Sequence, residues 1–262
     1  EHLRAGFWVD RVPAPERVIL TVGEIAAQNR RLMAEDASLH DLEGLPAVLT
    51  REQVRTWVER RSQPPTRQLF DERGDSIRAS RIAALVDAVQ TDDIPAEQPL
   101  RFALVTERAD LRTFPTRLRV FSSLGNTDID RWQESVLFPG TPVVIVHESK
   151  DGAWWFVVSR HYAAWVAKIH VAEGPRDMVL GYARREPYLV VTGAKVHTVF
   201  TPERPQVSEL QLEMGVRVPL LAEWPGDSLV NGQHPYTGHV VELPDRTQTG
   251  ELALVPALIP LT

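Results

Sequence analysis

The strongest constraint on the fold is a pair of apolar runs joined by an Asp-Gly turn. The first run is Val143-Val144-Ile145-Val146, the second is Trp154-Trp155-Phe156-Val157-Val158, and Asp151-Gly152 lies between them. β-branched and aromatic residues favour strands, and glycine readily takes the positive φ that a tight turn requires. These residues predict a β-hairpin. With a third strand at Trp165-Val166-Ala167, they predict a compact β barrel over residues 100–172.

Residues 1–99 are predicted to form a helical region. Apolar residues recur at helical spacing in 23–36, 50–61 and 76–90, and each range is expected to form a helix. Thr50 and Gln53 have the spacing of a capping box at the start of the second helix, and Pro64-Pro65 ends it.

Two segments of this region are predicted to lie outside helices. Residues 1–17 are expected to be extended and docked through Phe7 and Trp8, or to be a simply anchored terminus. The polar segment 91–99 is interrupted by proline, and it is therefore expected to be the linker into the barrel.

A second small barrel is predicted after residue 173. Short strand-like runs recur there, and the runs 239–243 and 251–255 flank a turn-forming segment, which predicts a hairpin with a longer turn. The other expected strands cover 188–191, 195–200 and 215–222.

Composition excludes several classes of protein. The formal net charge of −6 over 262 residues disfavours a nucleic-acid partner. No apolar run approaches 18 residues, so no membrane span is predicted. The chain has no cysteine, which excludes disulfides, thiolate metal sites and a cysteine nucleophile. Because the chain begins with Glu1, a processed or trimmed product is expected.

Four separated motifs carry a resemblance to a known family. They are Asp110-Leu111-Arg112-Thr113-Phe114-Pro115-Thr116, Asp130-Arg131-Trp132-Gln133-Glu134-Ser135, Asp151-Gly152-Ala153-Trp154 and Trp165-Val166. In this order they resemble the bacterial SH3 domain of NlpC/P60 cell-wall peptidases. The resemblance implies a mainly β fold with a helical N-terminal region and two small SH3-like β barrels. The implied domains are a helical stabilising region with its linker at 1–99, a first barrel at 100–173 and a second barrel at 174–262.

The resemblance also implies a function. The Asp-Cys-Ser-Gly motif that carries the nucleophile of these enzymes is absent from the 262 residues, so no catalytic residue is predicted. The chain is expected to be the non-catalytic, substrate-shaping and domain-positioning region of a peptidase similar to γ-D-glutamyl-L-diamino-acid endopeptidases. The implied partners are a peptidoglycan stem peptide and an NlpC/P60 catalytic domain, in cis or in trans. The implied location is the periplasm or cell envelope, and no cofactor is expected. A stand-alone peptidoglycan-binding module and a scaffold for a separate enzyme remain alternatives.

Four residues are the candidate ligand-binding residues: Arg112, Asp130, Trp132 and Trp154. The Arg112 guanidinium is suited to pair with a carboxylate, either that of Asp130 or that of a peptide. Asp130 is expected to cap a short helical turn through the amides of Trp132 and Gln133. The alternative is a catalytic carboxylate set formed by Asp128, Asp130 and Glu134.

Alternation along a strand places Trp154 and Trp155 on opposite faces of the sheet. One is expected in the core, and the other exposed or covered by a neighbouring domain. His234 and His239 are five residues apart in a loop with no further ligand nearby, so no metal site is predicted. His161 is expected in an exposed turn.

Overall fold

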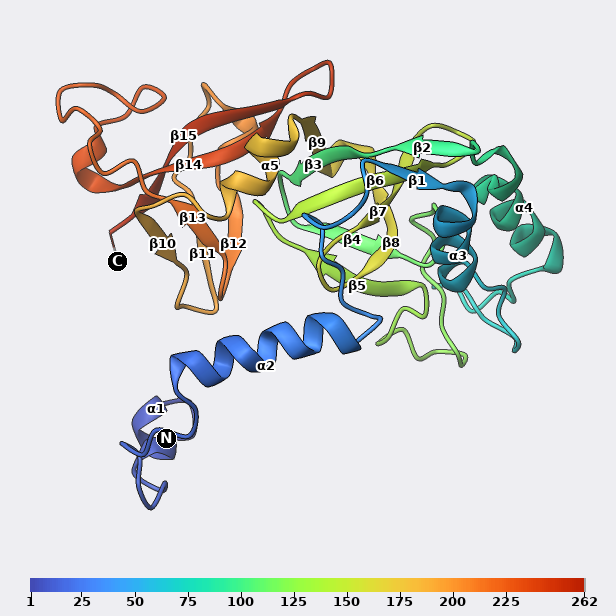
Figure 1. Cartoon of the computed structure of the whole chain (residues 1–262), viewed down its shortest axis with the longest axis horizontal. Helices are drawn as coiled ribbons and strands as arrows, with labels where there is room; N and C mark the ends of the chain where they lie inside the picture. The colour runs from blue at the N-terminus through green and yellow to red at the C-terminus, as the bar shows by residue number, and fades with distance from the viewer. Residues whose placement is uncertain (262) are drawn as a thin grey trace. The chain divides into compact units, whose positions relative to one another are not determined.

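The computed structural model describes residues 1–261, with the exception of the Thr237 side chain. The chain forms two compact units, residues 1–39 and the residues from 40 onward. The fold is mainly β with helices near the N-terminus, which confirms the predicted fold class (Figure 1). No helix within 1–261 is both long enough and apolar enough to span a bilayer.

The N-terminal unit contains two helices, α1 (Ala5–Val9) and α2 (Val22–Glu35). Thr21 and Glu24 form a capping box at the start of α2, which explains where this helix begins. The prediction of an extended segment docked through Phe7 and Trp8 is wrong. The two rings instead pack edge to face at 5.1 Å within a helical turn, and Trp8 is 58% exposed.

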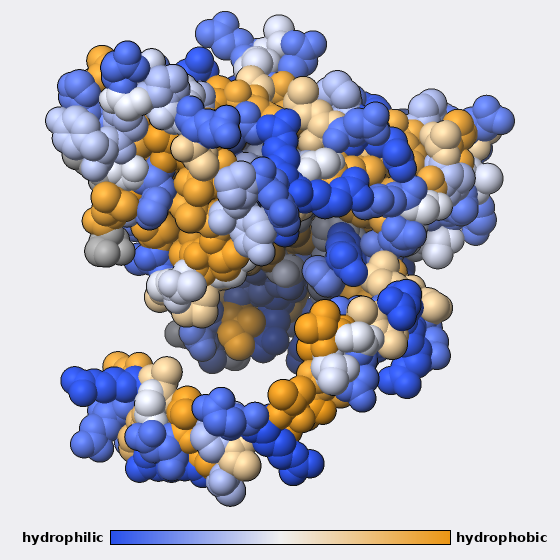
Figure 2. Space-filling model, turned by 60° about the vertical axis from the view of Figure 1, so that its left-hand side comes forward, coloured by the Kyte–Doolittle hydropathy of each residue, from blue (hydrophilic) through white to orange (hydrophobic). Residues whose placement is uncertain are grey.

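Apolar side chains of α2 also stay exposed. Val22, Ile25 and Leu32 lie on the surface, and no residue of α2 is buried. Figure 2 shows apolar patches of this kind interrupting the polar surface of the protein.

The second unit opens with β1 (Val48–Thr50), α3 (Arg51–Arg61) and α4 (Ala79–Val89). The predicted capping box of Thr50 and Gln53 is confirmed, because each side chain accepts a hydrogen bond from the other residue's backbone amide. Helix α4 ends at Gln90, whose φ of 52° is left-handed and stops the helix.

The prediction that residues 91–99 form a linker is wrong. The segment contains a 3₁₀ turn, η1 (Thr91–Asp93), and a strand, β2 (Glu97–Pro99), which pairs antiparallel with β1. Between them Ile94 is fully buried. Burial of this one apolar side chain fixes a segment whose composition is otherwise that of a loop.

A seven-stranded antiparallel sheet forms the centre of the second unit, with the strand order β5-β4-β8-β7-β6-β3-β9 (Figure 1). The predicted hairpin is confirmed as β6 paired with β7, and Gly152 has a φ of 67° in its turn. The 3₁₀ turn η2 (Lys168–His170) links β8 to β9. The strands are β3 (Arg101–Val105), β4 (Ala109–Arg112), β5 (Gln133–Leu137), β6 (Pro142–Glu148), β7 (Trp154–Val158), β8 (Ala163–Ala167) and β9 (Val171–Gly174).

The sheet is buried on both faces, and this corrects the prediction for the two tryptophans. Trp154 and Phe156 join the core that contains residues of α3 and α4, whereas Trp155 and Val157 join a second core on the other face. Trp154 and Trp155 do alternate, but neither is exposed. Trp155 is covered by the cationic side chains of Arg101 and Lys168 from the same unit.

Residues after 175 form a helix and three two-stranded sheets. The sheets surround a separate apolar core, whereas the buried side chains of the helix join the core that contains Trp154. The predicted hairpin is confirmed, and its strands β14 (Gly238–Arg246) and β15 (Leu252–Pro260) are longer than expected. The helix α5 (Arg176–Tyr182) was not predicted. The remaining elements are β10 (Tyr188–Val190), β11 (Lys195–His197), η3 (Pro205–Val207), β12 (Gln211–Glu213), β13 (Arg217–Pro219) and η4 (Pro235–Thr237).

Candidate functional site

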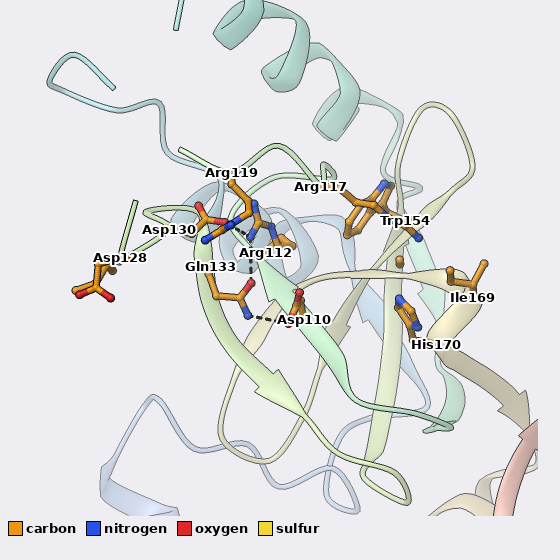
Figure 3. Close-up of a pocket in the computed structure, with 12 residues that line it drawn as sticks. Asp110, Arg112, Arg117, Arg119, Asp128, Asp130, Gln133, Trp154, Ile169 and His170 are labelled. Carbon is orange, nitrogen blue, oxygen red and sulfur yellow. Dashed lines mark hydrogen bonds and ion pairs between the residues drawn. The ribbon is translucent and has the colours of Figure 1, made fainter. Parts of the chain in front are cut away.

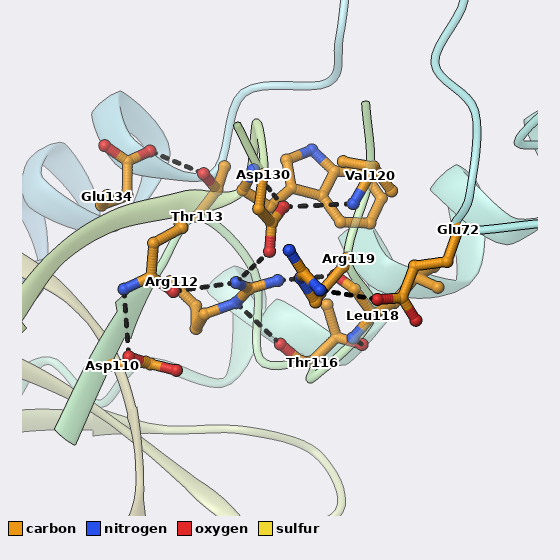
Figure 4. A network of polar contacts seen from close by, with 12 residues as sticks. Glu72, Asp110, Arg112, Thr113, Thr116, Leu118, Arg119, Val120, Asp130 and Glu134 are labelled. Carbon is orange, nitrogen blue, oxygen red and sulfur yellow. Dashed lines mark hydrogen bonds and ion pairs between the residues drawn. The ribbon is translucent and has the colours of Figure 1, made fainter. Parts of the chain in front are cut away.

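An ion pair between Arg112 and Asp130 lies at the centre of the candidate site. Arg112 is the last residue of β4, and its Nη1 lies 2.5 Å from Oδ2 of Asp130 (Figure 4). Arg112 is 3% exposed and Asp130 is 9% exposed. Of the two partners considered for Arg112, Asp130 and a peptide carboxylate, the structure shows Asp130.

The rest of the Arg112 guanidinium is also engaged. Nε donates to the carbonyl of Thr116 at 3.1 Å, Nη2 donates to the carbonyl of Leu118 at 2.5 Å, and Nη1 also donates to Gln133 at 3.0 Å. A buried charge is tolerated only when it is paired and its hydrogen-bonding capacity is satisfied. Arg112 thus holds the loop that follows β4, with four of its five N–H donors bonded within the protein.

Asp130 organises the turn before β5. Its Oδ1 accepts hydrogen bonds from the backbone amides of Val120 at 3.1 Å and Trp132 at 3.0 Å. The predicted contact with the Trp132 amide is confirmed, but no helix follows, and the Gln133 amide donates to the backbone carbonyl of Asp130 instead. The capping carboxylate therefore fixes a turn that leads directly into a strand.

A cleft of about 680 Å³ lies over this ion pair (Figure 3). Three of the four candidate residues line it, whereas Trp132 is buried beside Phe114, with ring centroids 5.4 Å apart, and does not. The residues that line the cleft are Asp110, Arg112, Arg117, Arg119, Asp128, Ile129, Asp130, Gln133, Trp154, Ala167, Ile169 and His170.

Several cleft residues are held by neighbours. Arg119 forms an ion pair with Glu72 at 2.7 Å, and Asp110 accepts a hydrogen bond from Gln133 at 3.2 Å. His170 lies 2.8 Å from Glu107, and this hydrogen bond holds the pKa of the Glu107 carboxyl below its ordinary value. The walls of the cleft are therefore set by contacts within the protein.

Arg117 and Asp128 differ from these residues. Within residues 1–261 neither side chain forms an ion pair or a hydrogen bond. Sequence reasoning did not single out Arg117, Arg119, Ile129, Ile169 or His170. The one available signal for Arg117 was its position directly after the Asp110–Thr116 motif, and that signal does not separate it from an ordinary surface arginine.

The three acids that were considered together have separate roles. Asp130 is locked in the buried ion pair, while Glu134 accepts hydrogen bonds from Arg61, Thr113 and Tyr162. The hydrogen bonds of Glu134 connect α3 to the sheet. Because Asp130 and Glu134 are each bonded to other residues, they do not form the alternative catalytic set of carboxylates. Within residues 1–261 no group of three or more histidine, aspartate or glutamate side chains could hold a metal ion.

Comparison with known proteins places an SH3 fold at this site. Residues 119–167 match the family model of an SH3 domain of the SH3b1 type. This range includes Asp130, β5, the hairpin of β6 and β7, and Trp165. The predicted resemblance to a bacterial SH3 domain is therefore confirmed for this part of the chain.

A solved structure extends the likeness in fold. An NlpC/P60 endopeptidase from Photobacterium damselae subsp. piscicida has a TM-score of 0.64 to this chain at 15% sequence identity. The match covers 93% of this chain and 53% of the endopeptidase, so this chain spans about half the length of that protein. A comparison with curated proteins finds no match to this chain.

Proposed function

We propose that this chain is a non-catalytic region of an NlpC/P60 peptidoglycan peptidase. In this role it positions the catalytic domain and forms one wall of the groove that receives the stem peptide. The observation that carries the proposal is the cleft on the SH3b1-type barrel, in a chain whose fold follows an NlpC/P60 endopeptidase over 93% of its length.

The structure of the cleft suits a wall better than a reaction centre. Its base is the buried Arg112–Asp130 ion pair, and the sequence contains no cysteine to act as a nucleophile. A fixed wall contributes by orienting one substrate and excluding others. In the proposed arrangement the chemistry is supplied by an NlpC/P60 catalytic domain, in cis or in trans, at the cell envelope or in the periplasm.

The proposed domain division follows the same scheme. Residues 1–99 form a helical stabilising region, 100–173 the first SH3-like barrel and 174–262 the second. The separate apolar core formed by residues from 189 onward supports a second barrel, and the buried side chains of α5 pack into the core of the first. The pairing of β2 with β1 supports placing residues up to 99 with the helical region.

Co-sedimentation with purified peptidoglycan sacculi tests the proposal. We expect the chain to sediment with sacculi, to remain in solution with chitin of the same particle size, and to release no peptide detectable by mass spectrometry. Failure to sediment, or equal sedimentation with chitin, would contradict a peptidoglycan-directed role. Release of stem-peptide fragments by the pure chain would contradict its assignment as non-catalytic.

A stand-alone peptidoglycan-binding module is the second candidate. It is favoured by the fact that all twelve residues lining the cleft lie between Asp110 and His170, so the SH3-like barrel builds the cleft by itself. Two results together would favour this candidate: the pure chain binds sacculi, and the protein isolated from its host carries and binds no catalytic domain.

A further inference from the structure

We propose that Arg117 is the residue of the cleft that recognises its peptide, by pairing with a free carboxylate. This inference deepens the proposed function and rests on it for the identity of the peptide. The two are tested separately below.

Arg117 is the cation of the cleft that remains available for a ligand. Arg112 is buried, and four of its five N–H donors are bonded within the protein, one of them to the carboxylate of Asp130. Arg119 is held by Glu72 and lies over the ring of Phe121 at 5.3 Å. Arg117 is exposed and forms no ion pair or side-chain hydrogen bond with any residue in 1–261.

The backbone on both sides of Arg117 is clamped by the buried guanidinium. Arg112 donates to the carbonyl of Thr116 and to the carbonyl of Leu118, the two neighbours of Arg117 in the chain. The Leu118 amide also donates to the Thr116 hydroxyl at 3.1 Å. Arg112 is thus a positioning residue, and the geometry orders the Arg117 backbone before a ligand arrives. Ordering in advance lowers the entropic cost of binding.

Exposed apolar side chains line the same cleft as Arg117. Ile129 and Ile169 both line the cleft, and they are 58% and 55% exposed. Trp154, the first residue of β7, also lines the cleft, although only 7% of its surface is exposed. Large apolar side chains left exposed around a polar cleft are typical of a binding surface, so they offer contacts to the methyl and methylene groups of a peptide.

The chemistry favours a carboxylate as the recognised group. An arginine fork donates two parallel hydrogen bonds to a carboxylate, and the pair is strengthened by charge. In a peptide linked through the γ-carboxyl of glutamate, the α-carboxylate stays free along the chain and supplies this group. Within the described part of the chain the side chain of Asp128 forms no ion pair, and it lies on the far side of the cleft from Trp154 and Ile169 (Figure 3). Its negative charge repels a ligand carboxylate at that end of the cleft, so it disfavours a peptide bound with its carboxylate there.

Two peptides that differ in one group test the inference by isothermal titration calorimetry. They are L-Ala-γ-D-Glu-L-Lys and its analogue with the glutamyl α-carboxylate converted to an amide, both amidated at the C-terminus. In the first peptide the glutamyl group is then the sole free carboxylate. We expect the wild-type chain to bind it about 10- to 100-fold more tightly than the analogue, because a charge-assisted bidentate contact is lost.

The variant Arg117→Gln is expected to bind both peptides with equal, weaker affinity. The matched control is Arg160→Gln, which changes an exposed arginine of the same barrel that does not line the cleft. It is expected to keep the wild-type preference.

A second pair of variants tests the apolar contacts. Ile169→Ser should weaken binding of both peptides, whereas Leu124→Ser, which changes an exposed apolar residue outside the cleft, should not.

The outcomes separate the two proposals. Equal affinity of the wild type for both peptides, or an unchanged preference in Arg117→Gln, overturns the carboxylate site and leaves the proposed function standing. Binding of neither peptide also overturns the carboxylate site. It overturns the proposed function as well if the chain does not sediment with sacculi.

Discussion

The guanidinium of Arg112 lies 2.5 Å from the carboxylate of Asp130, and neither residue is more than a tenth exposed. These two residues are 18 positions apart in the sequence, and their contact closes the loop that forms the floor of the cleft. The pair determines where Arg117 lies, because the same guanidinium also binds the carbonyls on either side of that residue.

The variant Arg112→Ala is expected to be strongly destabilised. Removing one partner leaves the Asp130 charge buried and unpaired, which costs about 3–5 kcal/mol in the free energy of unfolding. Urea denaturation measures this loss. The control is Arg117→Ala, an exposed change expected to stay within about 0.5 kcal/mol of the wild type. A small effect of Arg112→Ala would mean that the pair does not support the fold.

Trp165→Ala and Trp154→Ala are each expected to cost about 3–5 kcal/mol, because both remove a large buried side chain from the same core. Trp165 is fully buried, and its indole Nε1 donates to the hydroxyl of Ser62 at 2.9 Å. Trp165→Phe is the milder comparison, since it keeps most of the apolar volume and loses the hydrogen bond. Thermal melts of both alanine variants that match the wild type would contradict the placement of β7 and β8.

Glu134→Gln is expected to loosen helix α3. The carboxylate of Glu134 accepts from Arg61, Thr113 and Tyr162, each at 2.6 Å, and Arg61 is the last residue of α3. An amide supplies one acceptor oxygen in place of two and no charge, so we expect a loss of about 1–3 kcal/mol. Hydrogen exchange should show reduced protection in α3. Unchanged protection in α3, together with reduced protection in other elements, would contradict this account.

Acidification is expected to destabilise the fold through His147. Burial lowers the pKa of its imidazole below the ordinary value of 6.5, although the hydrogen bond to the Val89 carbonyl at 2.8 Å opposes the shift. Between the unfolded pKa and the lower folded pKa, the unfolded chain binds more protons, so stability present above pH 6.5 is lost as the pH falls.

The variant His147→Gln measures the His147 contribution. One such group imposes a slope of at most about 1.4 kcal/mol per pH unit. The melting temperature of the wild type should therefore fall more steeply than that of His147→Gln between pH 7 and 5. His40, whose pKa is also lowered mainly by burial, remains in both proteins. Parallel pH profiles would show that His147 is not linked to unfolding.

Local patterns predicted those parts of the fold that local physics determines. The turn at Gly152 and the capping box of Thr50 depend on residues a few positions apart, and both were predictable. The burial of Trp154 was not, because it depends on α3 and α4 covering one face of the sheet. The prediction of a linker at 91–99 failed for a similar reason. The polar composition of the segment did not indicate that Ile94 would be buried.

The candidate site was predictable only in part for the same reason. Arg112 and Asp130 have residue types suited to pair, and the structure brings them together across 18 positions. Arg117 carries no comparable signal in the sequence. Its significance depends on the hydrogen bonds that Arg112 makes to Thr116 and Leu118, which exist only once the loop has closed.

The most direct test of the central claim is a mass-spectrometric analysis of this protein isolated from its natural host under native conditions. We predict that peptides of this chain are recovered with peptides carrying an Asp-Cys-Ser-Gly motif, either on one polypeptide heavier than 29.5 kDa or on a bound partner. Recovery of the chain at 29.5 kDa, with no such motif on it or on any bound protein, would contradict its role as a region of an NlpC/P60 peptidase.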